Sequence, residues 1–260
     1  MIKFCNLYSG SSGNSTYIEY KDTRILVDAG VSCQKIVKGL DELGVTLDMI
    51  NGILITHEHL DHTKGLTTIS KKFNTPIYAT IKTWAQMSPL KLPEYNHVLF
   101  NANEVFSIGD LNIFPFSIPH DAADPCAFNV LAGNKKLTIA TDIGHINPEI
   151  YNKLIGSDVL LLESNYDPNT LTYGHYPYFL KKRICSDVGH LSNESASKVI
   201  KKLYDETGIN NIILGHLSKE NNFPELAYQT VVNEFGCIPE KLNLSVASRD
   251  KIDNVLVLNA

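Results

Sequence analysis

Three histidines and an aspartate occur within six residues, in the string Thr56-His57-Glu58-His59-Leu60-Asp61-His62-Thr63. The string follows the apolar run Gly52-Ile53-Leu54-Ile55, which is typical of a buried strand. In an extended segment, side chains two residues apart point the same way, so His57, His59 and Asp61 share one side. His62 joins them only if the chain turns, and the helical pattern that opens at 63–66 predicts that turn. Imidazole and carboxylate ligands at a strand end, without cysteine, predict a site for zinc, manganese or iron.

Three further candidate ligands each follow an apolar segment that has the pattern of a strand. They are His120 after Ile118-Pro119, Asp142 after Ile139-Ala140-Thr141, and His216 after Ile212-Ile213-Leu214-Gly215. Alone, each is more commonly a capping or hydrogen-bonded loop residue. Together they place every candidate at the carboxyl end of a strand, where loop-borne sites collect. A centre of two ions needs more ligands than the central string supplies, and these residues can provide them.

Two other segments have the composition of supporting elements. The strand predicted at 24–27 leads into Asp28, which either caps a helix starting near Ser32 or orients a ligand histidine. A hairpin predicted from strands 2–8 and 15–20 encloses a loop of small polar residues. The backbone amides around Ser11, Gly13 and Asn14 can approach a phosphate closely, and a flexible hairpin tip is the alternative.

The order of the elements predicts an α/β fold. Short strands are expected at 105–108, 111–118, 126–131 and 137–141, and a second run follows with strands at 159–163 and 211–214 and helices at 192–204 and 224–235. Residues 81–103 are irregular and indicate a helix and a surface connection. This order predicts two mixed β-sheets face to face with helices outside, an αββα sandwich. No linker divides the halves, so we expect a single domain over residues 1–260.

The composition is that of a globular protein, with 43% hydrophobic and 20% charged residues among 260. No apolar run is long enough for a membrane span, and the first residues show no leader, so we expect a cytoplasmic protein without a membrane partner. Five scattered cysteines indicate reduced thiols. The net charge of -5 argues against a non-specific DNA binder, although bound cations still let a site accept phosphate.

The ordered motifs, from His57-Glu58-His59-Leu60-Asp61-His62 through His120 and Asp142 to His216, resemble those of the metallo-β-lactamase superfamily. The resemblance implies the fold already predicted and a cofactor of two divalent metal ions, zinc or manganese. It implies that His57, His59 and His120 hold one ion, that Asp61, His62 and His216 hold the other, and that Asp142 bridges them.

Three further strings are similar to the phosphodiesterase members, including the transfer-RNA-processing enzyme RNase Z: Leu162-Glu163-Ser164-Asn165, Gly189-His190-Leu191-Ser192-Asn193 and Gly215-His216-Leu217-Ser218. In that branch an acid and a histidine between the bridging aspartate and the last ligand assist the leaving group, and Glu163 and His190 occupy those positions. The alternative for His190 is a loop histidine beside a helix that starts at Ser192.

Over essentially its whole length the chain resembles the YycJ/WalJ family of bacterial metallo-β-lactamase-fold proteins, described as 5′→3′ exonucleases of double-stranded DNA. The resemblance rests on Ser9 to Ser15, Asp28-Ala29-Gly30, the central string, Pro119 to Pro125, and the strings around Glu163 and His190. One position departs, because Tyr166 stands where we expect a histidine. The cap domain of β-CASP nucleases and the long arm of RNase Z have no counterpart here.

Residues 173–183 combine aromatic and basic side chains, in Tyr173-Gly174-His175-Tyr176-Pro177-Tyr178 followed by Phe179-Leu180-Lys181-Lys182-Arg183. Such a run suits base stacking and phosphate contact, and Lys181 is our candidate substrate contact there. A packed helix with a solvated face is the equal alternative. His97 and His145 lie in irregular stretches, and we expect both at the surface.

These residues favour a metal-dependent phosphodiesterase or nuclease, in particular a 5′→3′ exonuclease of double-stranded DNA. A hydroxide that bridges two divalent metals would attack phosphorus, with Asp61, Glu163 and His190 in the catalytic set and His190, oriented by Glu163, protonating the departing oxygen. Hydrolysis of a lactone, thioester or β-lactam on the same ions is the rival enzymatic hypothesis. A metal-binding interaction module is a third. Metal identity, DNA or RNA preference, polarity and oligomeric state stay open at this stage.

Overall fold

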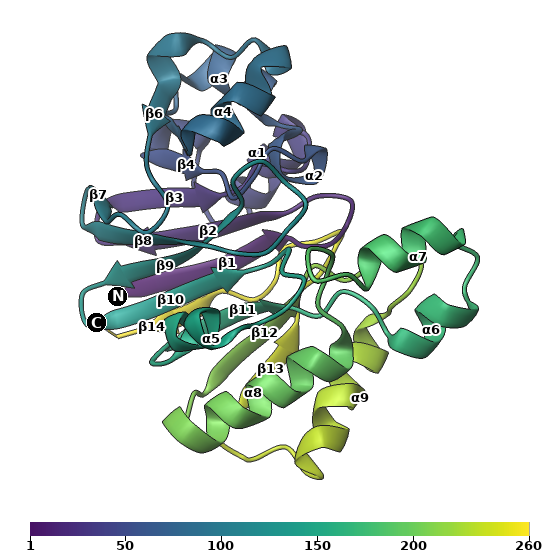
Figure 1. Cartoon of the computed structure of the whole chain (residues 1–260). Coiled ribbons are helices and arrows are strands. Elements are labelled where there is room, and N and C mark those ends of the chain that lie inside the picture. The colour runs from purple at the N-terminus through teal and green to yellow at the C-terminus, as the bar shows by residue number, and fades with distance from the viewer. Residues whose placement is uncertain (260) are drawn as a thin grey trace. The chain divides into compact units, whose positions relative to one another are not determined.

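The computed structural model describes residues 1–259, and its fold divides into two compact units. Unit 1 comprises Met1–Ser117, Ala122–Asn134 and the described part of Ser248–Ala260, and unit 2 comprises Ile118–Asp121 and Lys135–Ala247. The single domain expected over 1–260 stays a prediction, and Ala260 lies outside the described residues. Figure 1 follows the chain through both units.

One sheet of unit 1 is mixed, and its pairing changes from antiparallel to parallel at strand β3. Its strand order is β14-β1-β2-β3-β4-β5-β6. The pairs β14·β1, β1·β2 and β2·β3 are antiparallel, and the pairs from β3 to β6 are parallel. The strands are β1 (Ile2–Tyr8), β2 (Ser15–Tyr20), β3 (Thr23–Val27), β4 (Gly52–Leu54), β5 (Ile77–Ala79), β6 (His97–Leu99) and β14 (Leu256–Leu258). The hairpin predicted at 2–8 and 15–20 is therefore confirmed.

Unit 1 also holds a three-stranded antiparallel meander. It consists of β7 (Phe106–Ile108), β8 (Leu111–Ser117) and β9 (Cys126–Ala132). Alternating burial along β8 shows that one of its faces is packed, as expected for an antiparallel strand. The turn between β7 and β8 is formed by Gly109-Asp110, where Gly109 has a positive φ of 52°.

The helices of unit 1 are short and amphipathic. In α1, Ile36 and Leu40 are fully buried, and the Ser32 side chain accepts a hydrogen bond from the Lys35 amide at the helix start. The helices are α1 (Cys33–Asp41), α2 (Leu60–Thr63), α3 (Leu66–Phe73) and α4 (Ile81–Met87), with 3-10 turns η1 (Leu47–Met49), η2 (Ser88–Leu90) and η3 (Glu94–Asn96). Ser32 therefore takes the capping position that was one of the two readings of Asp28.

Unit 2 is built on four parallel strands with helical connections. The strands pair in the order β10-β11-β12-β13, with bounds β10 (Lys135–Ala140), β11 (Val159–Glu163), β12 (Asn211–Gly215) and β13 (Asn243–Val246). All five residues of β11 are buried, which is why this strand reads as a continuous apolar run. Since parallel strands end at the same edge, residues that follow β10, β11 and β12 lie together.

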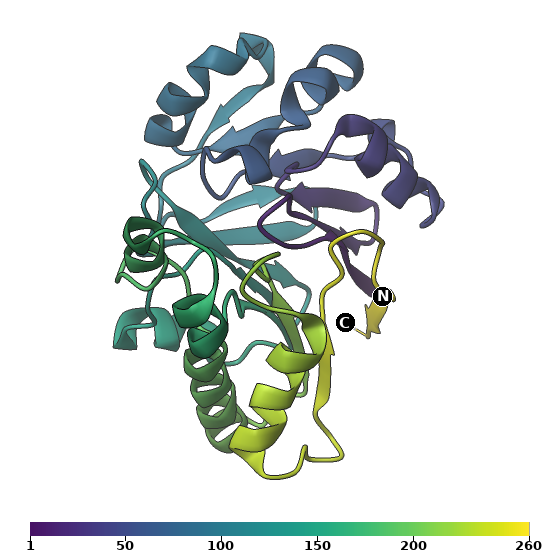
Figure 2. The same cartoon turned by 90° about the vertical axis from the view of Figure 1, so that its right-hand side faces the viewer.

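The helices of unit 2 are α5 (Pro148–Leu154), α6 (Pro168–Tyr173), α7 (Tyr178–Ile184), α8 (Asn193–Thr207) and α9 (Pro224–Phe235). Figure 2 shows α8 and α9 side by side, where the rings of Tyr204 and Phe235 meet with centroids 5.6 Å apart. Ser192 caps α8 by accepting a hydrogen bond from the Ser195 amide. Helix α8 was predicted and is confirmed, and α9 spans the range expected for it.

Over residues 1–259 the strands belong to two sheets of seven strands each, and both sheets are mixed. This confirms the predicted α/β class. None of the helices in residues 1–259 combines the length and the apolar composition needed to cross a bilayer.

Candidate metal centre

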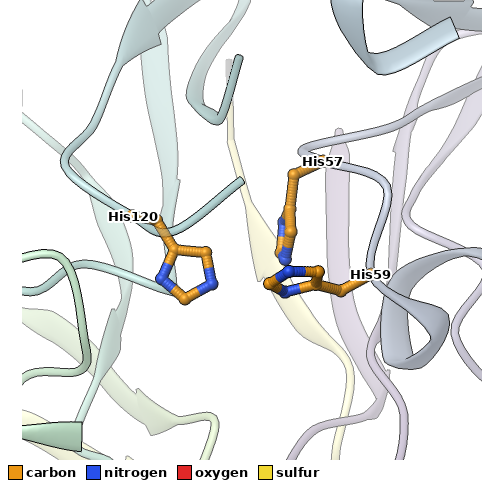
Figure 3. A group of neighbouring side chains, drawn as sticks. All are labelled: His57, His59 and His120. Atoms are coloured by element: carbon orange, nitrogen blue, oxygen red, sulfur yellow. The ribbon is translucent and has the colours of Figure 1, made fainter. Parts of the chain in front are cut away.

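The histidines of unit 1 converge because the chain turns at the end of its central string. His57 and His59 lie in the loop after β4, and α2 begins at Leu60, so the predicted turn is confirmed. The ring centroids are 4.5 Å apart for His57 and His59 and 4.2 Å apart for His57 and His62. Figure 3 shows the first pair meeting edge to face, and it also labels His120 on the segment after β8.

A buried carboxylate fixes the orientation of His62. Asp28 Oδ2 lies 2.7 Å from His62 Nδ1, which must donate because a carboxylate only accepts. Asp28 Oδ1 accepts from the Thr56 amide at 2.9 Å, and the Thr56 hydroxyl contacts both carboxylate oxygens. With Nδ1 protonated, Nε2 of His62 carries the lone pair that binds a metal. The geometry is the one required by the prediction that Asp28 orients a ligand histidine.

Backbone hydrogen bonds join the loops that contain Asn14 and Gly30 to the metal motif at Asp61. The Asn14 amide donates to the Asp61 carbonyl at 2.8 Å, and the Gly30 amide donates to the Asn14 carbonyl at 2.8 Å. A Cβ at Gly30 would lie 1.6 Å from the Asp61 carbonyl oxygen, so only glycine permits this approach. The absence of a side chain at Gly30 therefore allows the three loops to pack against one another.

The small polar loop at 9–14 is tied to this packing. The Asn14 side-chain oxygen accepts from the Gly10 amide, and its Nδ2 lies 3.2 Å from His62 Nε2. Asn14 and Gly13 are buried, whereas Ser11 is exposed. Through Asn14 the loop contacts His62 and Asp61 and so supports the metal motif. The substrate contacts expected of Ser11, Gly13 and Asn14 stay a prediction.

In unit 2, the carboxylate of Glu163 is fully buried and accepts four hydrogen bonds. Oε1 accepts from His190 Nδ1 at 2.9 Å and from His216 Nδ1 at 2.8 Å. Oε2 accepts from the amides of Ile143 at 2.8 Å and Leu191 at 3.0 Å. One carboxylate therefore holds two histidines and the two loops beside them. It has no exposed surface through which it could touch a substrate.

The other candidate ligands of unit 2 surround this carboxylate. The potential ligand atoms of Asp142, Glu163, His190 and His216 all lie within 4.8 Å of one another. His120 donates Nδ1–H to the Gly189 carbonyl at 3.1 Å, and its Nε2 lies 3.6 Å from Asp142 Oδ1. The structure thus brings together the candidate ligands and catalytic residues that the sequence singled out in unit 2, namely His120, Asp142, Glu163, His190 and His216.

Three of the strand-end residues adopt the left-handed region of backbone space. Asp28 has φ 63°, Asp142 has φ 59° and His216 has φ 54°. Non-glycine residues in this region cost free energy and persist where the surrounding structure holds them, which is common at functional sites. The backbone of both units is thus bent sharply where side chains are delivered.

The electrostatics of the unit 2 cluster follow from burial and pairing. Burial alone would raise the pKa of Glu163, but the charge of His190 and the hydrogen bonds from His190 and His216 lower it to about 2. Burial alone would lower the pKa of His190, yet the charge and hydrogen bond of Glu163 raise it above its ordinary value. For His120 burial prevails and lowers the pKa. Glu163 is therefore a carboxylate whose negative charge favours a protonated His190.

A layer of buried amides behind the cluster escaped sequence reasoning. Asn165 Nδ2 donates to the His216 carbonyl at 2.8 Å, and Asn222 Nδ2 donates to the carbonyls of Ser164 and Asn165. Asn222 also bonds the Asn193 side chain. Asn165 stands two residues after Glu163 in the sequence, but nothing in its type marks it as a support, because its partner His216 is distant in the chain.

The positions that the sequence left ambiguous have defined surroundings. Tyr166 is buried and packs with Leu171 and Ile184 at the base of α6 and α7. Lys181 Nζ donates to the carbonyls of Thr172 and Gly174, so its ammonium closes the end of α6. The substrate contact expected of Lys181 stays a prediction. His97 and His145 are exposed, as expected.

Comparison with known proteins gives the chain clear relatives. Residues 23–216 match the family described as Beta-lactamase superfamily domain. The chain is 37% identical to Exodeoxyribonuclease YycJ of Bacillus anthracis, over 88% of each chain. It is 39% identical to Exodeoxyribonuclease WalJ of Streptococcus pneumoniae, over 90% of this chain and 88% of that protein.

Solved structures with the same fold are more distant in sequence. The metallo-beta-lactamase fold protein YhfI of Bacillus subtilis superposes with a TM-score of 0.75 at 14% identity, covering 98% of this chain and 100% of YhfI. The short form of human tRNase Z gives a TM-score of 0.64 at 16% identity, covering 98% of this chain and 100% of that chain. These two similarities concern the fold.

The Asp28–His62 hydrogen bond generates a test of metal retention. Asp28→Asn keeps an acceptor for the Thr56 amide but weakens the hold on His62, and losing such a partner costs about 10- to 100-fold in metal affinity. We expect one of the bound ions to have a dissociation constant that is higher by about this factor, measured by competition with a chromogenic chelator. Asp41→Asn at the exposed end of α1 is the control. Unchanged affinity in Asp28→Asn would show that Asp28 does not orient a ligand.

Proposed function

The chain belongs to the YycJ/WalJ family of metal-dependent hydrolases with the metallo-β-lactamase fold, and we propose that it removes nucleotides from the 5′ ends of double-stranded DNA. The hydrogen-bonded pair of Glu163 and His190 carries this proposal. A histidine fixed by a carboxylate beside candidate metal ligands suits a leaving group that needs a proton, as a departing nucleotide oxygen does. Carbonyl hydrolysis does not require this pair.

The donor set fits two divalent ions. His62, His120 and His216 each donate Nδ1–H to a fixed acceptor, namely Asp28, the Gly189 carbonyl and Glu163. This pattern leaves Nε2 of each ring for a metal. With imidazoles and carboxylates and no thiolate, the set suits zinc or manganese. We propose that His57, His59 and His120 hold one ion, that Asp61, His62 and His216 hold the other, and that Asp142 is shared.

Bound ions would supply an activated water and stabilise the negative charge that develops at phosphorus. The residues of the chain supply the rest. Glu163 fixes Nδ1 of His190, so Nε2 is the nitrogen that faces the substrate and can donate a proton to the departing 3′-oxygen. The His190 side chain keeps 21% of its surface exposed, which gives a substrate access to it. Glu163 positions both His190 and His216 without contacting the substrate.

The proposal includes a cytoplasmic location. The five cysteines carry no disulfide and two of them are buried, which suits a reducing compartment. The chain's relatives YycJ and WalJ are exodeoxyribonucleases, and the proposed substrate is likewise DNA.

The substrate class is tested with one panel. Protein stripped of metal and re-supplied with Mn²⁺ or Zn²⁺ is incubated with end-labelled duplex DNA, single-stranded DNA, RNA and a set of lactones. We expect a 5′ label on the duplex to appear at once in mononucleotide, and a 3′ label to pass through a ladder of shortening fragments. Turnover of lactones alone would refute the proposal in favour of carbonyl hydrolysis.

The leaving-group role is tested by His190→Ala. Removing a general acid typically costs 10²- to 10⁴-fold in rate, and we expect a loss of about that size at saturating metal, with metal content unchanged. His97→Ala is the matched control, since His97 is exposed on β6 in unit 1. Full nuclease activity in a metal-loaded His190→Ala enzyme would remove His190 from the mechanism.

A further inference from the structure

The pair of helices α6 and α7, with their connection, presents bare aromatic rings to solvent. Tyr173 is 86% exposed, Tyr178 is 76% exposed and Phe179 is 74% exposed. These three residues lie within seven positions of the chain, and Figure 1 shows α6 and α7 next to each other in unit 2. Large rings gathered in water are unfavourable unless a partner covers them, so such a cluster indicates a binding surface.

Cations accompany two of the rings along α7. In a helix, residues four apart lie on the same face, so Tyr178 stands beside Lys182 and Phe179 beside Arg183. Lys182 Nζ lies 5.8 Å from the centre of the Tyr178 ring. Lys182 and Arg183 are both exposed, whereas Lys181 faces the carbonyls at the end of α6. The surface therefore alternates flat rings with positive charge.

The combination of exposed aromatic rings and basic side chains indicates which kind of molecule binds to this surface. A protein surface that covered the rings with apolar side chains would also strip water from the ammonium of Lys182, which is costly for a charged group. Nucleic acid offers flat bases for the rings and phosphates for the cations. The whole chain carries a net charge of -5, so the positive charge is confined to this part of the surface. Such a local patch suits the binding of one strand rather than non-specific binding of any polyanion.

The helix pair packs against the part of unit 2 that carries Glu163 and His190. Its base is packed around Tyr166, three residues after Glu163. At the C-terminal end of α7, in the same cluster, the His190 amide donates to the Ile184 carbonyl at 2.9 Å. A Cβ at Gly189 would lie 2.2 Å from that same carbonyl oxygen, so the loop of His190 rests directly on the helix. Arg183 also forms an ion pair with Asp121, the residue after His120.

We propose that the exposed rings of Tyr173, Tyr178 and Phe179, with Lys182, form a stacking platform that binds unpaired nucleotides of the nucleic acid substrate. The proposal rests on the proposed nuclease function and specifies which part of the substrate is held. Because α7 contacts the loop of His190 directly, a strand stacked on the platform is held at a fixed place relative to that histidine. The platform thus favours substrates whose ends carry or open into a short single strand.

The test compares Tyr178→Ala/Phe179→Ala with wild type, both loaded with Mn²⁺. Binding of a fluorescent oligonucleotide with cleavage-resistant phosphorothioate linkages is followed by fluorescence anisotropy. We expect the double variant to bind about tenfold more weakly or worse, the effect of losing a stacked base. Its melting temperature and its hydrolysis of the small diester bis-p-nitrophenyl phosphate should match wild type. Tyr95→Ala removes a ring that is 72% exposed in unit 1 and should bind as wild type does.

Equal oligonucleotide affinity in the double variant and wild type would overturn the platform, as would an equal loss in Tyr95→Ala. A wild-type dimer that dissociates in the double variant, seen by sedimentation with oligonucleotide binding unchanged, would assign the rings to an interface between copies of the chain and also overturn it. If wild type degrades DNA while the double variant binds and degrades it equally well, the platform fails and the nuclease function stands. Wild type that neither binds nor cleaves nucleic acid refutes both.

Discussion

A fully buried carboxylate at the end of β11 is the constraint on which unit 2 depends. Burying a charge is costly unless hydrogen bonds replace its hydration, and Glu163 meets that requirement with four donors. The donors come from the segments after β10, before α8 and after β12, so the carboxylate holds three separate pieces of chain together. Removing one donor would leave a buried lone pair unsatisfied, which ties the positions of His190 and His216 to each other.

Unit 1 uses the same device. Asp28 directly follows β3 and accepts a hydrogen bond from His62, which comes after the neighbouring parallel strand β4. Glu163 ends β11 and receives His216, which follows the neighbouring parallel strand β12. Since adjacent parallel strands end at the same edge of a sheet, the fold itself brings a strand-end carboxylate beside a strand-end histidine. The sharp backbone bends at Asp28 and His216 then direct each side chain to its partner.

Much of this arrangement is predictable because it depends on local pattern. The hairpin, the turn after His59 and the strand-end placement of Asp142 and His216 all follow from apolar runs and the polar residues that end them. Strand β6 was not predicted, because it has three residues, two of them exposed, inside an irregular stretch. The sequence alone could not decide whether Asp28 caps the helix near Ser32 or orients a ligand histidine. Either role is compatible with an aspartate that follows a strand.

What the sequence could not supply are contacts between segments far apart in the chain. Gly30 looks like an ordinary turn residue until the Asp61 carbonyl is found where its side chain would be. The sequence also gives no sign that the Lys181 ammonium contacts the carbonyls of Thr172 and Gly174. Tyr166 departs from the expected histidine, and its burial against Leu171 and Ile184 shows that it anchors the α6 and α7 pair. Each role depends on tertiary neighbours.

We propose that Glu163 prepares His216 to bind one of two metal ions. The most direct measurement is the number of divalent ions per chain, obtained by native mass spectrometry after saturation with Zn²⁺ and removal of the excess, in wild type and in Glu163→Gln. A glutamine side chain has one oxygen and cannot accept from both histidines and both amides. We expect two ions in wild type and one in Glu163→Gln. Fewer than two ions in wild type would contradict the two-ion centre, and two ions in both proteins would show that Glu163 does not prepare His216 for metal binding.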